Sequence, residues 1–138
     1  MPITINGKEY AFKSGQTIYE VAKDNGIYIP VLCHHDRLKP VGACRVCVVE
    51  VEKARTLVVS CAMPAEEGMV VHTDTEKVRK SRKLTVELLI SQGHHNCITC
   101  EASGDCMLQN LAYSLGIEMP RFDGPEETRE PEQANEMI

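Results

Sequence analysis

Residues 30–61 read PVLCHHDRLKPVGACRVCVVEVEKARTLVVSC and contain four of the seven cysteines of the chain. Their spacing is Cys-x10-Cys-x2-Cys-x13-Cys, with the close pair in the middle of the segment. A Cys-x2-Cys pair in a loop supplies two neighbouring thiolates, and distant cysteines can close the shell around an iron-sulfur cluster. We interpret the segment as the site of a binuclear cluster with the ligands Cys33, Cys44, Cys47 and Cys61.

The residues around the close pair support this interpretation. Gly42 and Ala43 precede it and lack large side chains, so backbone N–H groups can approach the inorganic sulfides and stabilise their negative charge. Val46 begins a β-branched run over residues 46–51, which predicts a strand. We therefore expect the cluster loop to lead directly into a buried sheet.

The composition is that of one or two small globular domains. The chain has 138 residues, of which 43% are hydrophobic and 25% charged. No apolar run is long enough for a membrane helix, and no signal peptide is recognisable, so we expect a cytoplasmic protein without membrane insertion. Seven cysteines, four of them in Cys-x2-Cys pairs, then favour metal ligands over disulfides.

The segments that flank the cysteine loop predict a small α+β domain. Residues 3–5 and 9–12 surround Asn-Gly and predict a two-residue hairpin. A helix is expected from Thr17, which has capping-box spacing to Glu20, to a cap at Gly26. Further strand-like runs cover residues 56–60 and 69–72, so we place the first domain at residues 1–76.

A helix is predicted next, from Thr73, which has capping-box spacing to Glu76, to Ser91. Its first half carries a basic run that is either a solvated face or a docking surface for an acidic partner or cofactor phosphate. Its second half has little polar surface, so we expect that end to be buried. The basic residues are Lys77, Arg79, Lys80, Arg82 and Lys83, and the apolar ones are Val78, Leu84, Val86, Leu88, Leu89 and Ile90.

A second metal signal follows this helix. Cys97, Cys100 and Cys106 have the spacing Cys-x2-Cys-x5-Cys, which leaves a tetranuclear cluster one ligand short. A histidine directly upstream can complete the set, because imidazole replaces thiolate in some iron-sulfur sites. With four cysteines in the first site and three in the second, no cysteine is left over.

These motifs resemble a region shared by the large iron-sulfur subunit of complex I, iron-only hydrogenases, NAD-linked formate dehydrogenases and, most closely, the small diaphorase subunit of NAD-linked hydrogenases. The resemblance implies a β-grasp, plant-ferredoxin-like [2Fe-2S] domain followed by a small helical [4Fe-4S] domain with one histidine and three cysteine ligands. The residues that carry it are 28–30, Cys33, 42–47, Cys61, 97–101, Cys106 and 108–109.

The resemblance also indicates the histidine. The commonest family spacing would place it at position 93, which is Gly93 here, but the hydrogenase-diaphorase pattern Gly-Asn-His-Asn-Cys aligns with residues 93–97. This alignment predicts His95 as the ligand, with His94 as the alternative. The relatives usually continue into a further ferredoxin-like domain, which this chain does not include.

The rest of the chain is expected to form a helix and an acidic tail. A helix continues from Gln109 to a cap at Gly116, which completes a second domain at residues 77–117. Residues 118–138 contain seven acidic and two basic residues and are expected to form an extended tail, either disordered or ordered on a partner subunit.

Simpler interpretations remain for several of these residues. The cysteines and histidine would also suit a protein with two zinc sites. Cys61, beside a strand, fits a buried inert thiol. His72 lies in a strand-like run and is interpreted as structural, while His34 and His35 either tune the first cluster or lie at the surface.

The function favoured by these features is electron transfer. We expect a subunit that relays single electrons between a flavin-containing NAD(P)H-oxidising subunit and a catalytic subunit such as a hydrogenase or formate dehydrogenase. No dinucleotide fingerprint and no nucleophile with a plausible base is present, so partners must complete the chemistry. The alternatives are a stand-alone two-cluster ferredoxin, a self-contained enzyme and a zinc-binding interaction module; no nucleic-acid partner is expected.

Overall fold

The fold combines a mixed β-sheet with three helices. The computed structural model describes residues 2–92, 96–118 and 121–122. The strands form one sheet in the order β2-β1-β5-β3-β4, in which β1 and β5 run parallel and the other neighbours antiparallel. The elements are β1 (Ile3–Ile5), β2 (Lys8–Tyr10), α1 (Ile18–Asp24), β3 (Val48–Val51), β4 (Val58–Val59), β5 (Val70–His72), α2 (Glu76–Ser91) and α3 (Met107–Ser114).

The predicted hairpin and first helix are confirmed. β1 and β2 pair antiparallel through Asn6 and Gly7, whose φ angles of +51° and +81° suit the tight two-residue turn that Asn-Gly favours. Thr17 caps α1 with the complete capping box, accepting from the Glu20 backbone while the Glu20 side chain accepts from Thr17 N–H. The sequence signals at both ends of this segment therefore determine its local structure.

Helix α1 covers one face of the sheet and makes the first hydrophobic core. Ile18, Val21 and Ala22 are buried against sheet residues that include Ile3 and Val49. Two cysteines of the predicted first site also belong to this core, which places the cysteine loop at the edge of the sheet domain.

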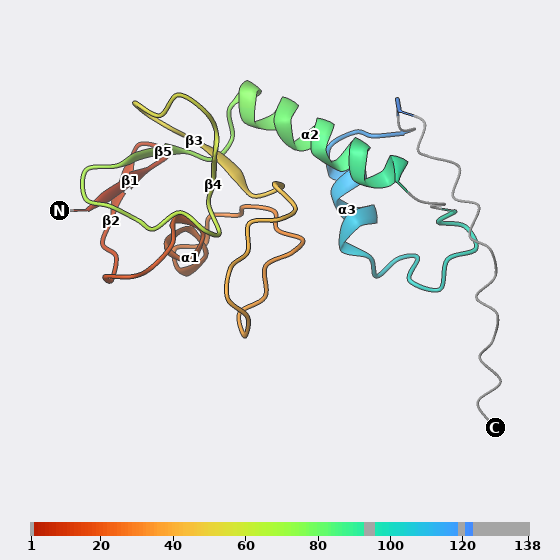
Figure 1. The fold of residues 1–138 in the computed structure, drawn as a ribbon, viewed down its shortest axis with the longest axis horizontal. Coiled ribbons are helices and arrows are strands. Elements are labelled where there is room, and N and C mark those ends of the chain that lie inside the picture. The colour runs from red at the N-terminus through yellow and green to blue at the C-terminus, as the bar shows by residue number, and fades with distance from the viewer. Residues whose placement is uncertain (1, 93–95, 119–120, 123–138) are drawn as a thin grey trace.

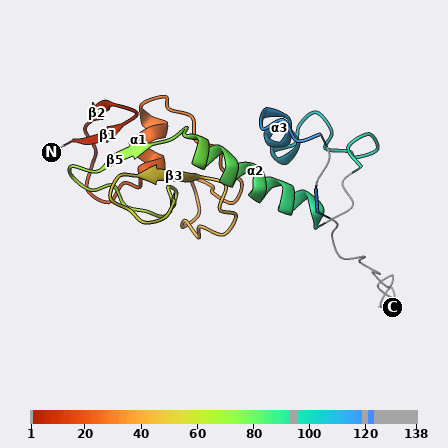
Figure 2. The same cartoon turned by 90° about the horizontal axis from the view of Figure 1, so that it is seen from above.

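Helix α2 joins the sheet to the rest of the chain. It runs away from the strands, and α3 lies beside its C-terminal half, as the two views show (Figures 1 and 2). α2 contacts both β3 and α3. A second core forms there from Val46, Val86, Leu111, Ala112 and Ile117.

The predicted start of α2 is wrong. The helix begins at Glu76 with Thr75 as its N-cap, whose side chain accepts from Val78 N–H; Thr73 instead is buried and bonded to Asn6. Asn6 hydrogen-bonds the Thr73 hydroxyl and N–H, so Thr73 cannot cap the helix and the chain bends through residues 73–74 before the helix begins.

The burial of α2 also departs from the expectation. Leu84 and Leu88 are 43% and 44% exposed, whereas the polar Arg82 and Glu87 are buried. The helix therefore buries one stripe of its first half as well as its second. No helix within the described residues is long and apolar enough to cross a membrane.

Candidate metal centre

The loop between residues 33 and 47 holds an unusual backbone conformation. Gly42 and Arg45 have φ angles of +61° and +60°. A Cβ on Gly42 would meet Val59 at 3.4 Å, an ordinary contact, so the backbone angle is what favours glycine there. Arg45, a larger residue in the same left-handed region, is the kind of local strain that collects at functional sites.

This backbone directs N–H groups at sulfur. The Cys44 N–H donates to Cys33 Sγ at 3.5 Å. Burial raises the pKa of the Cys44 thiol, but hydrogen bonds from the backbone of Val46, Cys33 and Leu32 outweigh it and hold that pKa below its usual range. The loop is thus built to stabilise a thiolate, which is the form that ligates iron.

Cys47 and Cys61 lie on the sheet side of the same site, and each is 1% exposed. Ser60 connects them, because its N–H and its hydroxyl donate to the Cys47 carbonyl at 3.2 and 2.6 Å. Burial raises the pKa of Cys61 to about 12, together with a hydrogen bond that the Cys61 thiol donates to Cys47 and the charges of Cys47, Cys33 and Cys44. The structure therefore brings all four predicted cysteines together, and donors of this kind fit a [2Fe-2S] cluster.

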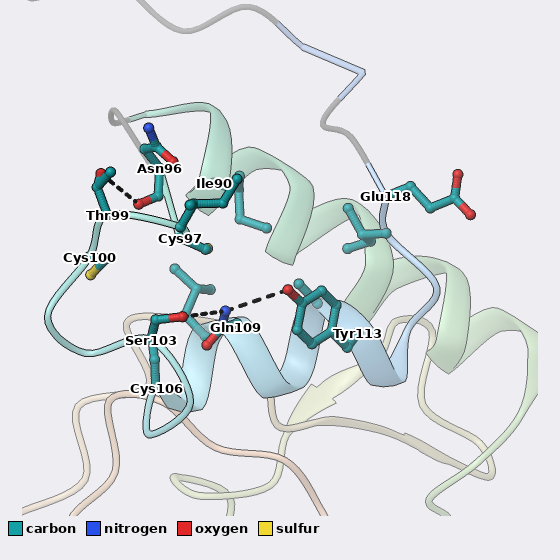
Figure 3. Close-up of a pocket in the computed structure, with 14 residues that line it drawn as sticks. Ile90, Asn96, Cys97, Thr99, Cys100, Ser103, Cys106, Gln109, Tyr113 and Glu118 are labelled. Atoms are coloured by element: carbon teal, nitrogen blue, oxygen red, sulfur yellow. Dashed lines mark hydrogen bonds between the residues drawn. The ribbon is translucent and has the colours of Figure 1, made fainter.

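The three remaining cysteines share one cavity of about 580 Å³. Cys97 and Cys100 come from the loop before α3, and Cys106 is the residue directly before that helix (Figure 3). Apolar side chains also line this cavity: Ile90 from α2, Leu108 and Ala112 from α3, and Ile117 from the segment after α3. Three thiols around a space of this size and polarity fit the ligands of a [4Fe-4S] cluster. His94 and His95 lie outside the described residues.

A polar group braces the loop that carries these cysteines. Gln109 Oε1 accepts from Gly104 N–H at 2.9 Å, and Gln109 Nε2 donates to Ser103 Oγ and Tyr113 Oη, each at 3.4 Å (Figure 3). Gln109 thereby ties the turn between Cys100 and Cys106 to the first turn of α3.

The described residues contain no preformed site for a single ion. Within them, no three His, Cys, Asp or Glu side chains form a group that could hold one metal ion. A structural zinc site requires four donors at about 2.0–2.3 Å from one centre.

The other three histidines differ in their exposure and in their contacts. The His34 side chain is 6% exposed and makes an edge contact with Tyr19, with ring centroids 4.7 Å apart. Its Nδ1 has no hydrogen-bond partner among the described residues. His35 is exposed, and its Nδ1 accepts from Arg37 N–H. His72 in β5 lies 3.2 Å from Glu52, in keeping with a structural role.

The sequence analysis did not identify two residues near the first site, Ser60 and Arg82. Ser60 gave no signal, because its role depends on the β3–β4 pairing. Arg82 was counted in the basic run, yet it is 6% exposed and its Nη2 donates to the Val48 carbonyl at 2.9 Å. Its spacing of four residues from both Val78 and Val86, which are buried, is the signal that could have identified it.

Comparison with known proteins supports both sites. Residues 1–76 match the model of the 2Fe-2S iron-sulfur cluster binding domain, which covers more than half of the chain. The chain belongs to this family. Residues 82–121 match the NADH-ubiquinone oxidoreductase-G iron-sulfur binding region, a 4Fe-4S model. The two predicted cofactor regions are thereby confirmed.

The similar proteins come from respiratory and hydrogenase complexes. The chain is 38% identical over 120 residues to the mitochondrial 78 kDa subunit of NADH-ubiquinone oxidoreductase of Candida albicans, covering 87% of this chain and 17% of that subunit. It is 36% identical over 136 residues to the gamma subunit of the NAD-reducing hydrogenase HoxS of Cupriavidus necator, covering 99% of this chain and 57% of that subunit.

A solved structure gives the same result for the fold. A chain of an NAD⁺-reducing [NiFe]-hydrogenase, crystallised in the H₂-reduced state, superposes with a TM-score of 0.84 at 40% identity. The match covers 89% of this chain and 52% of that chain. This chain therefore spans less than a fifth of these NADH oxidoreductase subunits and between about a fifth and three fifths of the hydrogenase chains that it matches.

Proposed function

We propose that this chain is an iron-sulfur electron-transfer subunit of a multi-subunit NAD(P)-linked oxidoreductase. It relays single electrons between a flavin-containing NAD(P)H-oxidising subunit and a catalytic subunit such as a hydrogenase or formate dehydrogenase. The observation that carries the proposal is the meeting of three cysteines of the loop over residues 33–47 with Cys61, which follows β4, at a place where the Cys44 N–H donates to Cys33 Sγ. When bound, iron-sulfur clusters supply one-electron transfer.

The proposal assigns each ligand. Cys33, Cys44, Cys47 and Cys61 hold the [2Fe-2S] cluster. The [4Fe-4S] cluster is held by Cys97, Cys100, Cys106 and His95, with His94 as the alternative to His95. In the first site, the loop residues present the outer thiolates and Ser60 fixes the inner pair by its bonds to the Cys47 carbonyl.

The chain divides accordingly. We propose a β-grasp [2Fe-2S] domain at residues 1–76, a helical [4Fe-4S] domain at 77–117 and an acidic tail at 118–138. The sheet order β2-β1-β5-β3-β4 with α1 across it supports the first of these. We also propose a cytoplasmic location for the chain, in keeping with the lack of a membrane-spanning helix among the described residues.

The test is an EPR spectrum of the anaerobically purified, dithionite-reduced protein. We expect two signals, of which Cys47→Ser removes only the binuclear one and Cys100→Ser only the tetranuclear one, while Ala102→Ser, an exposed matched change, keeps both. His95→Ala, compared with His94→Ala in the same spectrum, identifies the histidine ligand. Colourless, EPR-silent protein with stoichiometric zinc would refute the proposal.

NADH distinguishes a relay from a self-contained enzyme. A relay subunit should be reduced by dithionite but not by NADH alone, and NADH should reduce it once the flavin subunit of an NAD-reducing hydrogenase is added. Direct reduction of the isolated chain by NADH would contradict the proposed division of labour.

A further inference from the structure

Arg82 is a buried cation for which the described part of the chain offers no anion. Its residue is 6% exposed, its Nη2 donates to the Val48 carbonyl at 2.9 Å, and its Nε has no partner among the described residues. No carboxylate of the described residues lies in salt-bridge range of it. Buried charges in proteins are normally paired, because an isolated one loses its hydration without compensation.

The other cations of the basic run have different surroundings. Arg79 is exposed and paired with Asp74 at 2.7 Å, and Lys80 is exposed and lies 3.5 Å from Glu76. Lys83 is exposed to solvent. Only Arg82 points into the protein within this run, because it shares a helix face with the buried Val78 and Val86.

The four-cysteine site is a source of negative charge on the sheet side of Arg82, whereas the buried carboxylate of Glu87 is already paired with Arg121. Arg82 holds the carbonyl of Val48, the residue that follows Cys47 in the chain. Burial lowers the pKa of the guanidinium, while the charges of Asp74 and Cys47 and, more weakly, Tyr28 oppose that shift. Asp74 is an exposed surface carboxylate already bonded to Arg79, which leaves Cys47 as the buried counter-charge.

We propose that Arg82 is the counter-ion of the four-cysteine site and raises the reduction potential of the cluster held there. This inference rests on the proposed function. Reduction adds one negative charge to the site, and a buried cation stabilises that added charge more than a solvated one does. Through its bond to Val48, Arg82 also positions the strand that presents Cys47.

A purely structural role for Arg82 predicts a different outcome. If only the bond to Val48 mattered, substitution would lower stability without shifting the potential of a cluster that still binds. Arg82→Met removes the charge and keeps an apolar chain of similar length, whereas Arg82→Lys keeps the charge. Lys83→Met is the matched control, because it removes an exposed charge at the next position.

The experiment is an EPR-monitored redox titration of the full chain carrying both clusters. We expect Arg82→Met to lower the midpoint potential of the binuclear cluster, with a smaller change at the tetranuclear one. Arg82→Lys should stay near the wild-type midpoint, and Lys83→Met should leave both midpoints unchanged, since solvent screens that charge.

Three results would overturn the role of Arg82. One is a full binuclear signal in Arg82→Met with the wild-type midpoint, and another is an equal shift of both clusters. If Arg82→Met does not retain the binuclear cluster, Arg82→Lys decides: retention with a near-wild-type midpoint supports the counter-ion, and loss in that variant too refutes it. Absence of a binuclear signal in the wild-type protein would instead refute the proposed function.

Discussion

Gly42 shows how one backbone angle controls the first site. Its φ of +61° lies in the left-handed region, where a residue with a Cβ is disfavoured by about 1–2 kcal/mol. The neighbouring contacts to Val59 and Ala62, at 3.4 and 3.5 Å, would tolerate a methyl group. Within the polypeptide, the requirement for glycine is therefore conformational, and the space that a cluster needs around Gly42 stays a prediction.

Gly42→Ala is expected to lower the free energy of unfolding by about 1–2 kcal/mol, because alanine must adopt the same strained angle. Occupancy of the binuclear site should fall with it, while the tetranuclear signal stays. Chemical denaturation and the ratio of the two EPR signals measure these effects. Ala43→Ser, at the exposed next position, is the control; equal losses in both variants would contradict the conformational explanation.

At the scale of single elements, α2 carries two functions along one helix. Its first half presents Arg82 toward β3, and its second half supplies Val86 and Ile90 to the second core and to the wall of the second cavity. Such a helix cannot have the simple two-sided pattern of a surface helix, because its buried stripe faces different neighbours along its length. This explains why polar Glu87 is buried while Leu88 is exposed.

The start of α2 gives a prediction at this scale. Thr75→Ala should lower the free energy of unfolding by about 1 kcal/mol, because the Val78 N–H loses its side-chain acceptor. Thr75→Ser should retain the stability, since serine caps at least as well. Denaturant titrations of the three proteins measure the difference. Equal destabilisation by alanine and serine would show that the Thr75 methyl group, and not the cap, matters.

At the scale of the whole molecule, Glu87 on α2 binds Arg121, a residue distant in the sequence. Its carboxylate is 2% exposed and accepts from Arg121 at 2.7 and 2.8 Å, although 34 positions separate the two residues. Arg121 follows the end of α3 by seven residues, so this pair holds Arg121 against α2. The sequence did not indicate this ion pair, because Arg121 lies in the predicted acidic tail and the pair depends on how α3 packs along α2.

Removing the charge of the Glu87 carboxylate gives the third prediction. Glu87→Gln keeps the side-chain shape but loses the ion pair, so amide hydrogen exchange should become faster around residues 117–122 and remain unchanged in the sheet. Mass spectrometry of labelled peptides measures both regions. Glu76→Gln is the control, because its pair with Lys80 is exposed and 3.5 Å long. Unchanged exchange near Arg121 in Glu87→Gln would refute the fastening role.

The sequence by itself determined the features that depend on local signals. Asn6-Gly7 and the Thr17–Glu20 capping box predicted the hairpin and α1, and the cysteine spacings predicted the two iron-sulfur regions, because turns, caps and paired ligands are encoded within a few residues. Their signals lie within a few residues of each other, so the sequence alone reveals them.

Only the tertiary structure decided the roles that depend on distant partners. Thr75, and not the predicted Thr73, caps α2, because Asn6, 67 positions away, binds the hydroxyl and N–H of Thr73. Arg82 is buried, unlike the rest of the basic run, because it donates to the Val48 carbonyl in β3. Ser60 belongs to the first site because its hydroxyl donates to the Cys47 carbonyl. The physical reason is the same in each case: a buried polar group must find its hydrogen-bond partner inside the fold, and the fold alone determines which partner is near.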